Sequence, residues 1–238
     1  MTFEFTADKF FYAWRQLGVD RWPVPLAIRP SAAWRDDWET IESELRQRLR
    51  VLEDPDLLPV LRTAADPDMS LVMIGARKKP LRVYGAVTAN VGVTLVQRPD
   101  PGPDRIGNVV IEVGPPALVP KVFAAVAGDQ PAGRHTAMVE TWERLQDNTP
   151  AVGSVRDDSS TADRMRRLLA APRTGHGHIE VRADRHAERP SSPRYVSWFD
   201  VEGDGRYTYT RSYGDFHIDP CSTGRLQQRI GRLMGATG

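Results

Sequence analysis

The clearest pattern of hydrophobic and polar positions lies near the C-terminal end of the chain. Residues 194–201 and 206–213 are two runs rich in aromatic and β-branched side chains, with Asp204-Gly205 between them. An Asp-Gly pair between such runs favours a tight hairpin, because both turn positions need positive φ angles. A short run at 216–218 predicts a third strand. A terminal helix then follows, with its apolar positions at Leu226, Ile230, Leu233 and Met234.

Helical spacing dominates the first sixty residues. Thr6 is typical of a helix N-cap, and the helix after it presents Phe10, Phe11, Trp14 and Leu17 on one face. A second helix is predicted from about residue 32 to 52, followed by a short helix after Asp54-Pro55. The apolar stripe of the second helix is Trp34, Trp38, Ile41, Leu45, Leu49 and Leu52.

The middle of the chain changes to runs of Val, Leu and Ile that are typical of strands. Further helices and a polar segment then precede the C-terminal strands. The predicted strands are 70–74, 81–89, 91–97, 108–113 and one beginning at 177–182, and the predicted helices are 117–127, 136–145 and 161–170.

The chain contains a weak internal sequence repeat. Residues 109–115 form a strand ending in Pro before a helix, and residues 216–220 do the same. We therefore predict a single domain, 1–238, made of two α/β halves, each a small antiparallel sheet that ends in a helix. The approximate halves are 1–146 and 161–238, joined by a flexible segment at 147–160, which is polar and contains Pro and Gly.

Composition and charge narrow the possible functions. The net charge is +1, from 32 basic and 31 acidic residues, so nothing favours a nucleic-acid partner. A lone cysteine, Cys221, excludes an internal disulfide framework and favours a reducing compartment. No secretory leader is evident, and no apolar run approaches the roughly 18 residues of a membrane span. We expect a cytoplasmic protein with no membrane insertion.

One cluster could carry metal chemistry. His176, His178 and Glu180 alternate along a predicted strand, so the three side chains share a face. Two imidazoles and a carboxylate could hold Zn²⁺ with an open fourth position, which makes a metal-dependent hydrolase the alternative function. Solvent-facing polar residues opposite a buried strand face explain the same pattern more simply.

Other candidates for catalysis are weaker. The chain has no Gly-x-Ser-x-Gly elbow that would favour a Ser hydrolase. Cys221 precedes the terminal helix, where a helix N-terminus could lower its pKa, but no neighbouring motif supplies a base. We interpret Cys221 as a packing or capping residue.

The order of several motifs resembles the EspG family, the cytosolic chaperones of mycobacterial type VII (ESX) secretion. The C-terminal hairpin and the Pro220-led helix are the most specific part of the likeness. His176 and His178 stand where family members tend to have a Gly-Gln-Phe-Gly-like turn, and Trp198 is a further departure. The motifs are Phe5-Thr6-Ala7-Asp8-Lys9-Phe10, Trp22-Pro23-Val24-Pro25-Leu26, Asp54-Pro55-Asp56-Leu57, Val196-Ser197-Trp198-Phe199-Asp200 and Gly205-Arg206-Tyr207.

The resemblance implies an α+β fold, with a central antiparallel sheet, flanking helical bundles and two quasi-symmetric halves. It also implies a role without catalysis, cofactor or metal. The protein would bind the apolar tip of a helical PPE protein in a PE–PPE heterodimer, keep it soluble and target it for export. Covering an exposed apolar patch in this way prevents self-association of the client. The resemblance leaves self-association of the chaperone open.

Two sets of residues are predicted to contact the partner. Arg77, Lys78 and Lys79 form the clearest exposed basic strand connection and match the position of the family's contact loop between its second and third strands. A second set on the terminal helix faces away from that helix's apolar positions. Its members are Arg225, Gln228, Arg229 and Arg232.

Overall fold

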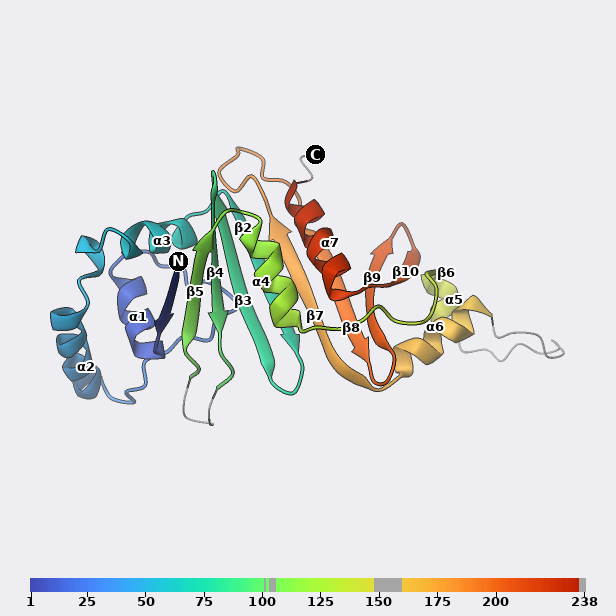
Figure 1. Cartoon of the computed structure of the whole chain (residues 1–238), viewed down its shortest axis with the longest axis horizontal. Helices are drawn as coiled ribbons and strands as arrows, with labels where there is room; N and C mark the ends of the chain where they lie inside the picture. The colour runs from blue at the N-terminus through green and yellow to red at the C-terminus, as the bar shows by residue number, and fades with distance from the viewer. Residues whose placement is uncertain (101, 103–105, 148–159, 236–238) are drawn as a thin grey trace.

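The computed structural model describes residues 1–100, 102, 106–147 and 160–235. These residues form one antiparallel sheet in the order β1-β5-β4-β3-β2-β7-β8-β9-β10-β6 (Figure 1). The strands are β1 (Thr2–Phe5), β2 (Met69–Ala76), β3 (Pro80–Thr88), β4 (Val91–Gln97), β5 (Val109–Gly114), β6 (Met138–Thr141), β7 (Arg173–Arg182), β8 (Arg194–Val201), β9 (Gly205–Ser212) and β10 (Asp215–Pro220). The helices are α1 (Ala7–Arg15), α2 (Arg35–Arg48), α3 (Leu57–Ala65), α4 (Leu118–Ala127), α5 (Trp142–Gln146), α6 (Thr161–Ala170) and α7 (Thr223–Gly235), with a 3-10 turn at Val51–Glu53.

The strand order repeats outward from the centre of the sheet. From the junction of β2 and β7, one side reads β2-β3-β4-β5-β1 and the other reads β7-β8-β9-β10-β6. Each meander follows a helix (α3 or α6) and leads into a helix (α4 or α7). Each outermost strand leads into a helix capped by a threonine, Thr6 for α1 and Thr141 for α5. The predicted α+β fold with quasi-symmetric halves is confirmed.

The two faces of the sheet are covered differently. Figure 1 shows α4 and α7 side by side across one face, which we call the covered face. Beneath them lies a core that includes Met73, Phe123, Ile179, Trp198 and Ile230. On the opposite face, α1, α2 and α3 pack over β3, β4 and β5, while α5 and α6 pack over β8, β9 and β10. Helices therefore cover both ends of that second face.

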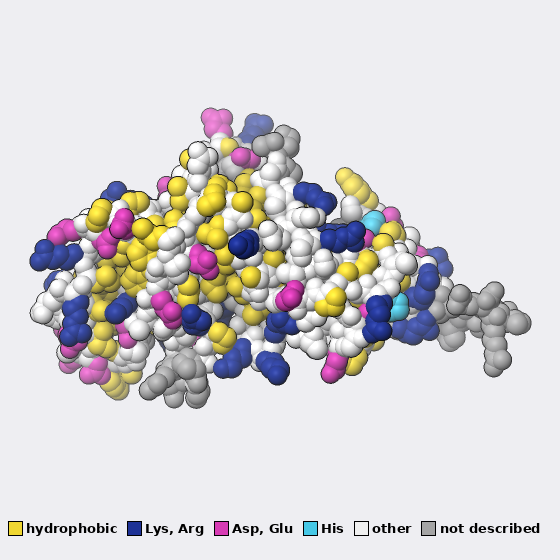
Figure 2. All heavy atoms as spheres, in the orientation of Figure 1, with side chains coloured by type: hydrophobic (Ala, Val, Ile, Leu, Met, Phe, Trp, Pro, Cys, Tyr) yellow, Lys and Arg dark blue, Asp and Glu magenta, His cyan; other side chains and the backbone are white. Residues whose placement is uncertain are grey.

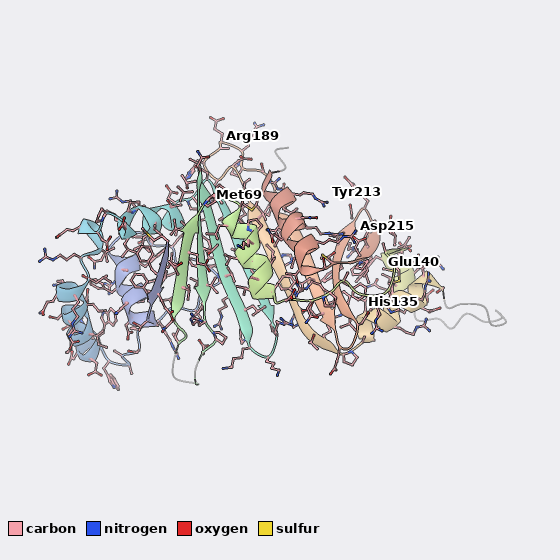
Figure 3. All side chains as sticks on the ribbon, in the orientation of Figure 1. Met69, His135, Glu140, Arg189, Tyr213 and Asp215 are labelled. Atoms are coloured by element: carbon pink, nitrogen blue, oxygen red, sulfur yellow. The ribbon has the colours of Figure 1, made fainter. Side chains whose placement is uncertain are left out.

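Several predicted boundaries were wrong, and β1 was not predicted. Residues 136–145 contain strand β6 followed by the short helix α5, not one helix, because Met138 and Glu140 are buried while Val139 and Thr141 are exposed. This alternation is the strand period. β6 pairs with β10 at the outer edge, and Glu140 and Asp215 mark the two strands in Figure 3.

The predicted joining segment and the second helix also differ in detail from the structure. Residues 148–159 lie outside the described part of the chain, so the division at 147–160 stays a prediction. α2 begins at Arg35, which leaves Trp34 76% exposed, and it ends before Leu52, which is also exposed. Trp38 and Leu45 are buried, as the apolar stripe predicted. No helix in the described ranges is both long and apolar enough to cross a membrane.

Candidate partner-binding surface

The middle of the second face is left uncovered between the two groups of helices. We call it the open sheet surface, and it consists of Val72, Ile74, His178, Glu180, Tyr195 and Ser197. On one side α3 reaches Tyr84 of β3, whose hydroxyl donates to the Ala64 carbonyl at 3.1 Å. On the other side the core under α6 begins at Phe199 of β8. The strands between these two residues carry no helix on this face.

Strand register sets the layout of the open sheet surface. Ile74 pairs with His178, which pairs with Ser197 on the next strand. In the neighbouring row Val72 pairs with Glu180, and Glu180 with Tyr195. Ile74 is 55% exposed and Tyr195 is 46% exposed, so the surface presents large apolar groups to solvent. Exposed apolar side chains that lie near one another are typical of interaction surfaces, which makes this surface the candidate site.

A groove of about 370 Å³ runs along one side of this surface. Its floor includes Val72 and Ile74, and its opposite rim carries Glu180 and Arg182. The wall is formed by α3 and by the Trp22-Pro23-Val24 segment. Arg21 and Arg185 also line the groove, so an apolar floor and wall are bordered by charged side chains. Such an arrangement suits an apolar segment of a partner with a polar rim.

His178 is held firmly at the centre of the surface. Its Nδ1 lies 2.7 Å from the Ser197 hydroxyl oxygen, and its ring stacks on Tyr195 with a centroid distance of 5.0 Å. Burial lowers the pKa of His178, and the nearby Glu180 carboxylate opposes that shift. The imidazole is therefore mainly neutral at pH 7.

His176, His178 and Glu180 lie on one face of β7, as their alternation predicted, but their contacts do not favour a metal site. His178 uses Nδ1 toward Ser197, and Glu180 forms an ion pair with Arg182. Within the described residues, no three His, Cys, Asp or Glu side chains gather into a metal-binding group. The geometry gives the hydrolase alternative no support.

The β2–β3 turn differs from the predicted basic loop in one respect. Arg77 turns inward, with its Nη2 atom 3.9 Å from the Asp200 carboxylate, and its side chain is only partly exposed. Gly128 has a φ of 92°, which favours glycine, and the Arg77 guanidinium occupies the space that a Cβ there would fill. Lys78 is exposed and Lys79 Nζ donates to the Asp100 carbonyl at 3.2 Å. Only the two lysines are available at the tip.

Asp200, which Arg77 approaches, forms a buried ion pair with Arg206 that was not predicted from the sequence. Arg206 and Asp200 are both fully buried, with Nε to Oδ1 at 2.7 Å and Nη2 to Oδ2 at 3.0 Å. Arg206 Nη2 also donates to the Ala127 carbonyl at 2.7 Å, which fixes the end of α4. Asp200 and Arg206 are partners across the β8–β9 hairpin. Opposite charges at equal distances on either side of the predicted turn are the sequence feature that could have indicated this ion pair.

The set predicted on α7 lies on the covered face, away from the open sheet surface. Leu226 and Ile230 of α7 pack against Trp198, on the side of the sheet opposite His178. Arg229 pairs with Asp219 at 2.9 Å, while Arg225, Gln228 and Arg232 are exposed. Dark-blue side chains on and beside α7 are visible on this face in Figure 2. The structure therefore does not bring the two predicted sets together.

Cys221 is a buried packing residue. Burial raises the pKa of its thiol, and its Sγ lies 3.6 Å from the Ser222 carbonyl. A buried neutral thiol is a poor nucleophile.

Comparisons with known proteins agree with this fold. None of the curated proteins matches the chain. A similar solved structure is that of the Mycobacterium tuberculosis type VII secretion system chaperone EspG5 in complex with a PE25-PPE41 dimer. It matches with a TM-score of 0.65 and 12% identity, covering 100% of this chain and 97% of that chain, and at such identity it shows the fold. A model of the EspG family matches residues 6–232. The chain therefore belongs to the EspG family.

Proposed function

We propose that this protein is a type VII (ESX) secretion chaperone that binds the apolar tip of a PPE protein within a PE–PPE heterodimer. The observation that carries the proposal is the open sheet surface, where Ile74 and Tyr195 are exposed between two walls of helices. A free chain gains nothing from exposing such groups, whereas a client tip could bury them. The role requires binding only, with no catalytic step, and it takes place in the cytosol before export.

Membership of the EspG family supports this class of client. The EspG5 protein of the similar structure is in complex with a PE25-PPE41 dimer. We carry over the class of partner to this chain and leave its identity to experiment. The groove between the Trp22-Pro23-Val24 segment and β7 gives a helical tip an apolar floor and a wall.

Charged residues form the rim of the proposed contact. Lys78 and Lys79 lie at the tip of the β2–β3 turn, beside the end of the open strands. Arg77 holds that turn in place through Asp200, so we assign it a positioning role. We place Arg225, Gln228, Arg229 and Arg232 outside the contact, because α7 packs on the covered face.

The test is co-expression with each PE–PPE pair encoded in the same genome, followed by pull-down and measurement of the complex mass. We expect one pair to form a one-to-one-to-one complex with the wild type. Ile74→Lys should abolish capture because it places a charge on the apolar floor. Val139→Lys is the matched control, since Val139 is 51% exposed on β6 and faces the other side of the sheet.

The outcomes test the chaperone function and the assignment of the open sheet surface separately. If no encoded pair is captured by the wild type, the chaperone proposal is wrong. If Ile74→Lys captures its pair as well as Val139→Lys does, the chaperone proposal stands and the open sheet surface is the wrong contact. Thermal unfolding of both variants confirms that each remains folded.

A further inference from the structure

His178 occupies the centre of the open sheet surface, and the proposed function does not yet use it. Its ring is fixed from two directions, by the Ser197 hydroxyl at 2.7 Å and by stacking on Tyr195 at 28° between the ring planes. An exposed histidine on a strand needs neither constraint. Together the imidazole and the phenol ring form a stacked aromatic pair, which we call the platform. It lies beside Ile74, which pairs with His178 across β2 and β7.

We propose that His178, held against Tyr195 by Ser197, is a specificity-determining residue that accepts an uncharged apolar side chain from the client's tip. The inference rests on the proposed function, because it concerns the same surface. The platform, not the groove alone, would then select the residue that a client presents at the centre of the interface, where binding energy is concentrated.

Charges around the platform favour an uncharged occupant. Glu180 on the same strand is paired with Arg182. Arg82, which pairs with Ile74 on β3, has its guanidinium 3.5 Å from the Asp100 carboxylate. The charged neighbours are therefore neutralised by partners of their own. A charged client side chain placed on the platform would lose water without gaining a free counter-ion, which is costly.

The same arrangement makes binding depend on pH. A client that covers His178 removes its remaining contact with water, and this disfavours the imidazolium. Three strands carry groups on the same face of the sheet as His178. These groups are Glu180 and His176 on β7 itself, Tyr195 and Ser197 on β8, and Ile74 on β2, with Arg82 of β3 beyond it. Of these only Glu180 favours the imidazolium, and it is already paired with Arg182. The client should therefore bind less tightly as the pH falls through the pKa of His178.

The experiment measures the affinity of the captured PE–PPE pair by biolayer interferometry at pH 7.5 and pH 5.5. We expect the wild type to lose about two- to fivefold in affinity at the lower pH, because covering the imidazole lowers its pKa further. His178→Phe should lose most of the pH dependence, because a neutral aromatic ring replaces a titrating one. His176→Gln is the matched control and should behave as the wild type.

The outcomes distinguish this inference from the function on which it rests. Unchanged pH dependence in His178→Phe overturns the role of His178, as does wild-type affinity that is equal or greater at pH 5.5. Greater affinity at low pH would indicate an acidic client residue at the platform. If the wild type binds no pair at either pH, the proposed function fails and this inference fails with it.

Discussion

The central strands β2, β7 and β8 have two faces that differ in chemistry and in purpose. Met73, Ile179 and Trp198 point toward α4 and α7 and are fully buried. The alternate residues, Ile74, His178 and Ser197, point the other way and carry no helix above them. The covered face joins the two halves into one core, whereas the open face lies uncovered between the helical groups. The same three strands thus supply a buried core on one side and, on the other, the surface that we propose binds the client.

Trp198→Ala should give one of the largest losses of stability, because the side chain fills the core beneath α7. We expect a loss of about 3–5 kcal/mol in the free energy of unfolding. The matched change on the open face, Ile74→Ala, should cost less than about 0.5 kcal/mol. Guanidinium unfolding of both variants measures the difference. Equal costs would show that the open face is packed as tightly as the covered one.

Asp200→Ala should cost a similar amount for an electrostatic reason. It leaves the Arg206 guanidinium fully buried without its carboxylate, and breaking such a pair costs about 3–5 kcal/mol. It also frees Arg77, so exchange of backbone amides at the β2–β3 turn should accelerate. The control is the double variant Asp200→Ala with Arg206→Met, which removes both charges and should recover part of the stability. A double variant less stable than Asp200→Ala would contradict this account.

Gly177→Ala should destabilise the covered face less severely, by about 1–3 kcal/mol, because a methyl group there overlaps the Trp198 indole. Combining it with Trp198→Ala should remove most of that cost, since the overlapping ring is gone. Gly231→Ala on α7 is the matched control, because open space surrounds that position. It should be neutral or stabilise the protein by about 0.5–1 kcal/mol. A cost for Gly177→Ala that persists without the indole would locate the strain in the backbone.

The sequence was sufficient for the elements with long patterns. The period-two alternation at residues 175–180 placed His176 and His178 on one face, and the aromatic runs at 194–201 and 206–213 predicted the β8–β9 hairpin. The outermost strands β1 and β6 have four residues each, which is too short for the alternation to stand out from a helical reading. Their identity depends on pairing with β5 and β10, which are distant in sequence.

The site was predictable only in part, because it depends on contacts between distant segments. Lys78 and Lys79 followed from the turn between two apolar strands. The inward direction of Arg77 depends on the space above Gly128 and on the carboxylate of Asp200. The open sheet surface results from where the two helical groups stop on the second face. No local pattern records that limit, so the sequence alone did not separate the β2–β3 turn from α7, which lies on the covered face.

The smallest effect on folding is expected from the two available lysines of the β2–β3 turn. The double variant Lys78→Glu with Lys79→Glu should change the free energy of unfolding by less than about 0.5 kcal/mol, because Lys78 has no ion pair among the described residues and Lys79 contacts only a carbonyl. Arg77 stays unchanged, so that the buried cluster at Asp200 is intact.

At the rim of the interface, the reversed charges should alter the association rate for a PE–PPE pair several-fold, with little change in dissociation. The difference should diminish as salt rises from about 0.05 to 0.5 M, because the Debye length shortens. Arg225→Glu with Arg232→Glu on α7 reverses the same amount of charge on the covered face, and it should leave the association rate closer to that of the wild type. Equal effects of the two double variants would mean that the rate responds to net charge and not to the position of the turn beside the open sheet surface.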